Sequence, residues 1–186
     1  MQRIETPLPG VVELRSDVYR DDRGLFLETY SQRRFAEIGI KDTFVQDNFS
    51  CSAKGVLRGL HYQLKNPQAK LCRVLQGAVF DVAVDVRLGS STYGKWTSVI
   101  LSAEKHNQLY VPAGFAHGFV ALEENTGFYY KCSDFYDKND EYGIVWNDTD
   151  LAITWDLAQP PLISEKDLRL PSLIMAEQMG NLPRRN

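Results

Sequence analysis

Three side chains that can move protons or hold charge lie close together in the middle of the chain. Arg58, His61 and Lys70 fall within 13 residues, each among apolar residues typical of β-strands. Charged side chains normally stay in water, so their concentration on apolar strands favours a lined pocket over a solvated surface. We therefore predict a polar site at the centre of the fold.

The chain contains three histidines, so the candidates for a general base are few. His106 lies in a polar loop, whereas His61 and His117 lie in apolar, strand-like segments. A histidine of this kind is more often a bonded core residue, but the neighbouring cations favour a functional role for His61. Arg58 and His61 would point to opposite faces of a straight strand, so we expect a β-bulge at Gly59 to realign them.

Motifs for metals and cofactors are missing from the sequence. There is no His-x-His pair, and His61 and His117 lie 56 positions apart, so we expect no transition-metal site. The chain has no Gly-x-Gly-x-x-Gly fingerprint, no P-loop and no Gly-x-Ser-x-Gly elbow. The remaining possibilities are cofactor-free acid–base chemistry and plain ligand binding.

Two further residues could contribute to such chemistry. Tyr130 lies in an aromatic segment, on the same strand face as Phe128 and Cys132. Such aromatics usually pack in the core, but a tyrosine that faces a polar pocket can donate a proton. Asp167 lies three residues after Ser164, where the carboxylate of a capping box would lie, so it too has a structural interpretation beside the functional one.

The elements that would position these residues are mostly strands. Apolar runs separated by Gly, Pro, Asn or Ser recur at short intervals, which is typical of an antiparallel sandwich or barrel. We predict an all-β fold in one domain over residues 1–186. The expected strands are 44–50, 56–64, 70–76, 78–87, 95–102, 108–111, 115–122 and 127–134.

Helical patterns are confined to the two ends of the chain. Before the strands, we expect a hairpin over 11–30 with its turn at 21–24, then a short helix capped by Ser31 and ended by Gly39. After them, a helix start at 164–167 and one or two turns over 173–179 make the C-terminal part, 160–186, a short helical segment.

Composition limits the partners and the compartment. A net charge of −3 leaves no basic surface, so we expect no nucleic-acid partner. No apolar run is long enough to span a bilayer and the N-terminus lacks the apolar core of a signal peptide, so we expect no membrane partner. Three cysteines without paired spacing, Cys51, Cys72 and Cys132, suit small buried residues in a reducing compartment. We predict a cytoplasmic protein.

An ordered set of motifs resembles the dTDP-4-dehydrorhamnose 3,5-epimerase family of dTDP-L-rhamnose biosynthesis. The resemblance runs from about residue 4 to 170. The motifs are Asp-Asp-Arg-Gly (21–24), Phe-Leu-Glu (26–28), Gln-Asp-Asn (46–48), Gly-Val-Leu-Arg-Gly-Leu-His-Tyr-Gln (55–63), Lys-Leu-Cys-Arg-Val (70–74), the strand 77–87, Tyr-Val-Pro-Ala-Gly-Phe-Ala-His-Gly-Phe (110–119), Tyr-Lys-Cys-Ser-Asp-Phe-Tyr (130–136), Glu-Tyr-Gly-Ile (141–144) and Ser-Glu-Lys-Asp (164–167).

The resemblance implies a cupin-type jelly roll, a homodimer that exchanges N-terminal strands from residues 1–50, and no metal or other cofactor. It also implies catalytic roles on a dTDP-4-keto sugar. His61 would remove a proton beside the ketone, with Asp167 orienting the imidazole. Lys70 would hold the enolate oxygen, and Tyr130 would return a proton to the opposite face.

The same resemblance assigns residues that bind the substrate. Arg23 and Glu28, both expected from the partner subunit, would line the nucleotide side with Gln46 and Asn48. Tyr136 would stack on thymine. The other expected contacts are Arg58, His117, Glu141 and Lys166. Asp81 is a candidate support for His61 or Lys70, outside the catalytic set.

Two alternatives remain open from the sequence. An epimerase that inverts C3 alone would use the same four catalytic residues. Such an enzyme would differ from a double epimerase only in how far the substrate extends into the site and in where the tyrosine lies. A non-catalytic sugar-nucleotide binding module would bind the dTDP-sugar without exchanging its protons. A keto-isomerase of the same barrel class fits the segments around His61 and Asp167 less well.

Overall fold

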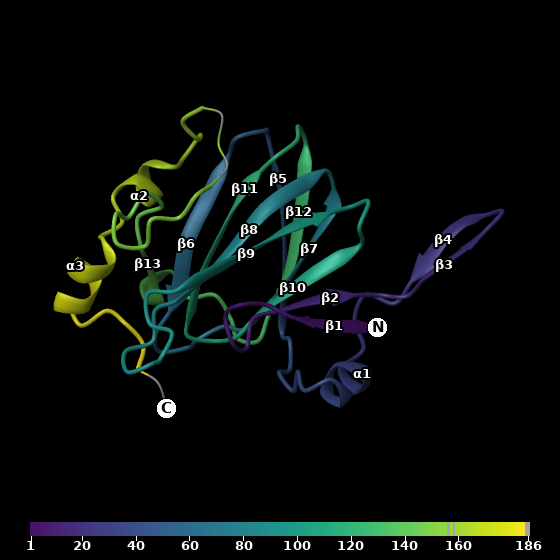
Figure 1. The fold of residues 1–186 in the computed structure, drawn as a ribbon, viewed down its shortest axis with the longest axis horizontal. Helices are drawn as coiled ribbons and strands as arrows, with labels where there is room; N and C mark the ends of the chain where they lie inside the picture. The colour runs from purple at the N-terminus through teal and green to yellow at the C-terminus, as the bar shows by residue number, and fades with distance from the viewer. Residues whose placement is uncertain (156, 158, 185–186) are drawn as a thin grey trace.

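Two antiparallel sheets form the body of the protein (Figure 1). The computed structural model describes residues 1–155, 157 and 159–184. The six-stranded sheet has the order β1 (Gln2–Glu5), β2 (Val12–Arg15), β10 (Asn107–Val111), β7 (Lys70–Gln76), β12 (Thr126–Cys132) and β5 (Gln46–Ser52). The five-stranded sheet has the order β13 (Glu141–Gly143), β6 (Leu57–Gln63), β11 (Phe115–Ala121), β8 (Ala78–Asp85) and β9 (Trp96–Ser102).

Alternation along the strands gives the five-stranded sheet two buried faces. On β8, Val79 and Ala83 belong to the core between the two sheets, whereas Val82 and Val84 belong to a second core on the opposite face. This is the alternation that the sequence of 80–86 predicts. Asp81 shares the inner face with Val79 and Ala83, so a carboxylate is buried between the sheets.

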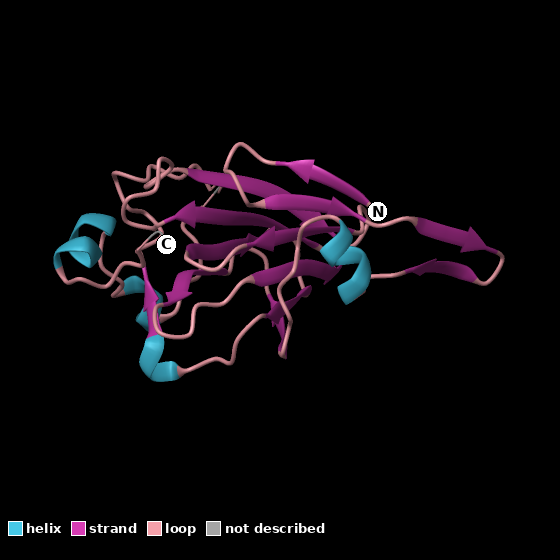
Figure 2. Ribbon diagram, turned by 90° about the horizontal axis from the view of Figure 1, so that it is seen from below, coloured by secondary structure: helices cyan, strands magenta, loops and turns pink. Residues whose placement is uncertain are grey.

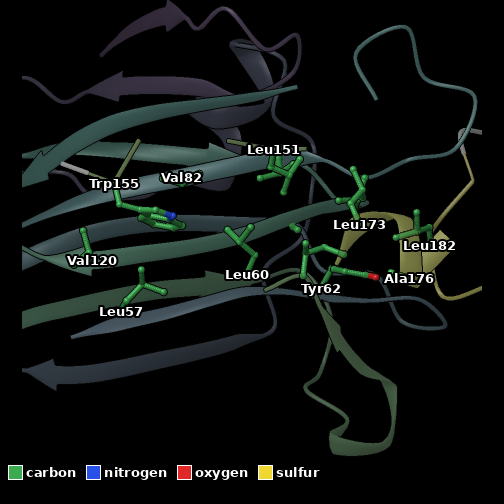
Figure 3. Packing of buried hydrophobic residues seen from close by; sticks show 14 residues of the cluster. Leu57, Leu60, Tyr62, Val82, Val120, Leu151, Trp155, Leu173, Ala176 and Leu182 are labelled. Carbon is green, nitrogen blue, oxygen red and sulfur yellow. The ribbon is translucent and has the colours of Figure 1, made fainter. Parts of the chain in front are cut away.

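The C-terminal part of the chain covers the outer face of the five-stranded sheet. Trp155 lies against Leu57 and Val120, as the close view of this core shows (Figure 3). Its ring packs edge-on against Phe80, with centroids 6.2 Å apart. Two short helices complete this layer, α2 (Glu165–Leu168) and α3 (Leu173–Gln178). The sheet thus anchors the segment that carries Asp167.

The N-terminal part departs from the predicted hairpin over 11–30. Only β3 (Val18–Asp21) and β4 (Gly24–Leu27) pair as a hairpin, while β2 joins the large sheet between β1 and β10. The prediction was wrong because an apolar run does not reveal its partner, and β2 buries its apolar residues against α1 (Gln32–Glu37). The β3–β4 hairpin projects away from the body (Figures 1 and 2).

The remaining expected elements are confirmed, with strand boundaries within two residues. Helix α1 begins after Ser31 and is followed by Gly39 in the left-handed region at φ +90°, although the Ser31 side chain makes no capping hydrogen bond. A 3-10 turn, η1 (Lys138–Asp140), precedes β13. Cys72 and Cys132 are buried as predicted, but Cys51 is exposed because it points outward from the edge strand β5. No helix within the described residues is long and apolar enough to cross a membrane.

Candidate active site

A cavity of about 730 Å3 opens between the two sheets. The strands β5, β6, β7, β11 and β12 contribute to its walls, and the segment before α2 closes one side. Ten of the residues proposed from the sequence line it: Asn48, Arg58, His61, Lys70, His117, Tyr130, Tyr136, Glu141, Lys166 and Asp167. Residues spread over 120 positions of sequence therefore meet at one polar site.

The predicted bulge at Gly59 is confirmed. The pairing of β6 with β11 shifts between His117↔His61 and Phe119↔Arg58, which turns Arg58 and His61 into the same cavity. Gly59 has φ +124°, and a Cβ there would come within 2.5 Å of the Gly118 Cα. Only glycine fits this close approach of two backbones, so the position of both side chains depends on it.

His61 and Asp167 form a directly bonded pair. The Nε2 of His61 lies 2.7 Å from Oδ1 of Asp167, and the Gly59 backbone N–H donates to Oδ2 at 3.3 Å. Burial raises the pKa of Asp167, but the bonds from His61 and Gly59 outweigh it, so the carboxyl pKa falls below its usual value. An ionised Asp167 holds the proton on Nε2 and leaves Nδ1 as the basic nitrogen.

Local structure brings Asp167 to this position. Leu162 forms backbone hydrogen bonds with Gly55 and Leu57, which attaches the segment before α2 to the edge of β6. The Ser164 hydroxyl then accepts a hydrogen bond from the Asp167 N–H at 3.1 Å, so the serine caps α2 as predicted. The Asp167 side chain does not complete a capping box, because it turns inward to His61.

Lys70 and Tyr130 face the same cavity from the large sheet. They lie on adjacent strands, with Lys70 opposite Cys132 and Cys72 opposite Tyr130. Burial is the main cause of a raised pKa at Tyr130, and the nearby Cys132 and Cys72 thiols raise this pKa further. The phenol is therefore protonated at neutral pH and available as a proton donor.

A second histidine–carboxylate pair lies beside the first. Nε2 of His117 is 2.7 Å from Oδ1 of Asp81 and 3.7 Å from Sγ of Cys72, and all three residues are buried. The sequence offered Asp81 as a support for His61 or Lys70; its hydrogen bond goes to His117 instead. Because His117 and His61 are direct partners in the β11–β6 pairing, the two imidazoles enter the cavity side by side.

The sequence also predicted no cluster of metal ligands, and here the geometry differs. Ligand atoms of Cys72, Asp81 and His117 lie within 4.8 Å of one another. Burial raises the pKa of the Cys72 thiol and, despite His117, that of the Asp81 carboxyl, so giving up either proton to bind a cation costs more than it does in water. Lys70 lies close enough to influence both groups, which further disfavours a divalent cation. This donor set does not fit a metal ion well.

The polar rim of the cavity is a connected network around Glu141. Its Oε1 accepts from Nζ of Lys166 at 2.7 Å and lies 4.0 Å from Nδ1 of His61. Its Oε2 accepts from the Tyr136 hydroxyl at 2.9 Å. Gln46 lines an adjoining space of about 260 Å3 that shares several walls with the main cavity. Most of the sequence-predicted contacts thus occupy one continuous surface.

Two predicted contacts lie away from this cavity. Arg23 is at the tip of the β3–β4 hairpin, where its exposed guanidinium pairs with Asp21. Glu28 follows β4 and accepts a hydrogen bond from Arg34 at 3.1 Å. Within one chain the structure does not bring either residue to the site, and their origin from a partner subunit stays a prediction.

Several lining residues escaped the sequence reasoning. They are mostly apolar groups or small polar groups without a chemical signature, and they include Phe49, Ser50, Phe119, Leu162, Ile163, Ser164, Gln68 and Cys132. Strand alternation does place Cys132 on the face of Tyr130, but its chemistry pointed to no role at the site. Nothing in the sequence would have found Leu162, because its place follows from a backbone bridge to Val56.

The chain is similar to known proteins of one family. The sequence profile of the dTDP-4-dehydrorhamnose 3,5-epimerase family matches residues 5–174. The chain belongs to this family. A Pseudomonas aeruginosa dTDP-4-dehydrorhamnose 3,5-epimerase is 52% identical over 168 residues, which cover 90% of this chain and 93% of the relative. Membership makes the chain an isomerase by family.

Solved structures of the epimerase family have the same fold. A 3,5-epimerase from Legionella pneumophila, in complex with dTDP-4-keto-L-rhamnose, superposes with a TM-score of 0.96 at 46% identity, covering 100% of this chain and 98% of that one. A 3'-monoepimerase from Streptomyces bikiniensis, in complex with dTDP-quinovose, has a TM-score of 0.92 at 33% identity, with coverage of 97% and 92%. The expected cupin-type jelly roll is confirmed.

Proposed function

We propose that this protein inverts C3 and C5 of dTDP-4-dehydro-6-deoxy-D-glucose to give dTDP-4-dehydro-L-rhamnose, without a cofactor. The observation that carries the proposal is the cavity in which a bonded His61–Asp167 pair, the Lys70 ammonium and the Tyr130 phenol line one space. Epimerisation next to a ketone requires a base on one face and an acid on the other. The relatives from Pseudomonas aeruginosa and Legionella pneumophila support this reaction by name, since both are 3,5-epimerases.

In the proposed mechanism, His61 takes the proton from the carbon beside the C4 ketone through Nδ1. The electrons of the broken C–H bond move to O4, and Lys70 stabilises the resulting enolate, an effect of roughly 3 kcal/mol for a preorganised partner. Asp167 stabilises the imidazolium that forms. Tyr130 then gives its proton to the opposite face, which inverts the carbon and restores the ketone.

The nucleotide part of the substrate would lie along the polar rim. Arg58 presents a guanidinium to the same cavity, suited to the diphosphate, and His117 lies next to the reacting histidine. Tyr136 is half exposed and would stack on thymine, with Gln46 and Asn48 nearby. Glu141 and Lys166 would complete the contacts on the sugar side.

The proposal includes a homodimer with exchanged hairpins. The projecting hairpin exposes Tyr19 and Phe26. Among the described residues, the edge strand β5 pairs with β12 alone, and it exposes Phe49. A partner hairpin paired along β5 would cover these apolar groups and would bring Arg23 and Glu28 to the cavity wall that β5 forms. A cytoplasmic location is part of the proposal, because a reducing compartment suits the three thiols.

Exchange of the hairpins between subunits can be tested by mixing two inactive variants. Arg23→Ala removes a residue donated to the partner's site, and Tyr130→Phe removes one from the chain's own site. If the hairpins are exchanged, co-refolded protein recovers about a quarter of the wild-type sites, since half of the dimers are mixed and half of their sites are intact. No recovery, or a monomer by light scattering, contradicts the exchanged dimer.

The C3-only alternative rests on the likeness to the 3'-monoepimerase. That structure is 33% identical to this chain, against 46% for the 3,5-epimerase from Legionella pneumophila, so double epimerisation is favoured. Incubation of substrate in D2O decides between them by NMR. Deuterium at C3 and C5 supports the proposal, and deuterium at C3 alone supports the alternative. Bound substrate without any exchange would instead identify a binding module.

Removal of the base provides the matching test. His61→Ala is expected to keep dTDP affinity, measured by calorimetry, and to lose exchange at both carbons. Near-normal turnover of this variant would refute His61 as the base.

A further inference from the structure

The proposed reaction leaves the enzyme in the wrong protonation state after each inversion. One inversion converts neutral His61 into an imidazolium and the Tyr130 phenol into a phenolate. The same base and acid must act again at the second carbon, so a proton has to leave His61 and another has to reach Tyr130 before the second inversion. A double epimerase therefore needs a route for protons between the site and water.

Only one nitrogen of His61 is available for this exchange. Nε2 is bonded to Asp167, a buried carboxylate with 4% of its side chain exposed, which gives the proton no way out. Nδ1, the nitrogen that accepts the substrate proton, faces Oε1 of Glu141 at 4.0 Å. This separation suits transfer through one water molecule or after a small side-chain rotation.

Glu141 connects the interior of the cavity with its rim. Its own side chain is 16% exposed, but its partners reach solvent: Lys166 has 57% of its side chain exposed, and Tyr136 is also exposed. Glu141 also lies near enough to Tyr130 to contribute to that group's raised pKa. It is thus the carboxylate that faces the base and acid from the side of the cavity nearest to water.

The charge of Glu141 suits a group that passes protons on. Burial raises its pKa, but the hydrogen bonds from Lys166 and Tyr136 and the neighbouring His61 outweigh burial, so the pKa lies below the usual value for glutamate. Glu141 is therefore ionised at neutral pH and can accept a proton, but it holds that proton only briefly.

We propose that Glu141 is the proton-exit group that resets His61 between the two inversions. The imidazolium N–H bond at Nδ1 breaks and its proton joins the Glu141 carboxylate, directly or through one water. The carboxylic acid then releases the proton to solvent, and the Tyr130 phenolate takes one proton from water. One proton leaves His61 and one reaches Tyr130 in each reset, so the enzyme has no net gain or loss of protons and the route needs no reactant other than water. This inference rests on the proposed function.

The test is Glu141→Gln, which keeps the size of the side chain and removes its ability to carry a proton. With enzyme saturated by substrate in D2O and quenched rapidly, so that a weaker sugar contact at residue 141 does not limit the rate, one deuterium per active site should still enter at the first carbon in a fast first phase. Exchange at the second carbon and steady turnover should then fall by about tenfold or more. Formate, azide or imidazole should restore the slow phase in proportion to concentration.

Two controls separate this role from binding and from the proposed function itself. Glu165→Gln makes the same chemical change on the exposed face of α2, where the glutamate pairs with Arg169, and should leave both phases and the buffer response as in wild type. Calorimetry with dTDP shows whether Glu141→Gln weakens binding, an effect that small acids and bases would not reverse.

Each outcome has a distinct meaning. A slow phase that follows a normal first exchange and responds to buffer supports the exit route. Unchanged turnover, or a uniform loss of both phases without rescue, overturns it while wild-type activity stands. Absence of exchange in the wild-type protein would instead overturn the proposed function.

Discussion

Replacing Asp167 by asparagine removes one negative charge from beside His61 and keeps the shape of the side chain. The amide oxygen can still accept the Gly59 N–H, so the local fold of α2 should survive. What changes is the environment of the imidazolium that forms when His61 takes a proton. The substitution therefore reports on the transition state more than on the resting protein.

The size of the effect follows from the contact. The pair is joined at 2.7 Å and the carboxylate is 4% exposed, so solvent screens the interaction only partly. A hydrogen bond to a charged group contributes about 1.5–3 kcal/mol, and two unit charges 4 Å apart interact by about 4 kcal/mol at an effective dielectric of 20. A loss of about 2–4 kcal/mol in the transition state lowers the rate about 30- to 900-fold.

The assay is deuterium exchange at C3 and C5 under saturating substrate, with dTDP affinity measured in parallel. Glu165→Gln is the matched control, because it removes a carboxylate two residues away on the exposed side of the same helix. Exchange that stays within about threefold of wild type, or a loss explained by weaker dTDP binding, would contradict the role given to Asp167.

Three other substitutions test separate parts of the structure. Tyr130→Phe should lower the rate of inversion by roughly a hundredfold or more, while the substrate still exchanges its proton with D2O without a change of configuration. If neither inversion nor exchange is slowed, the acid is another residue. Gly59→Ala should destabilise the fold in urea by more than the 1–3 kcal/mol typical of backbone strain, because its Cβ would meet Gly118; Gly89→Ala, also at positive φ but with no atom within 4 Å, should show strain alone. Asp85→Asn should lower the free energy of unfolding at pH 7 by about 2 kcal/mol, since donors from the following loop outweigh burial and bring the pKa of Asp85 from 3.8 to about 2. A carboxyl group whose pKa is lowered on folding stabilises the folded state at pH values above its unfolded pKa. The difference in unfolding free energy between wild type and Asp85→Asn should therefore shrink as the pH falls from about 4 towards 2, as measured by denaturation across pH. A difference that stays constant would contradict this role of Asp85.

Local patterns in the sequence were sufficient for most elements. The alternation in β8, the turn residues between strands and the Ser164 cap each depend on a few neighbouring residues, so they could be predicted one at a time. The hairpin over 11–30 failed because strand pairing is a contact between distant segments: β2 pairs with β10, more than 90 positions away, and not with β3. Exposure of Cys51 has the same origin, since it depends on β5 lying at an edge of the sheet.

The sequence by itself determined which chemical groups the site has, because residue types at fixed spacing carry the resemblance and the acid–base capacity of imidazole, phenol and ammonium groups. Only the tertiary structure decided how those groups are paired. It joined His61 to Asp167 across 106 positions, gave Asp81 to His117, and set Glu141 against the free nitrogen of the base. The physical reason is that a hydrogen bond or a charge interaction depends on separations of a few ångströms, which two packed sheets fix and a linear order of residues does not.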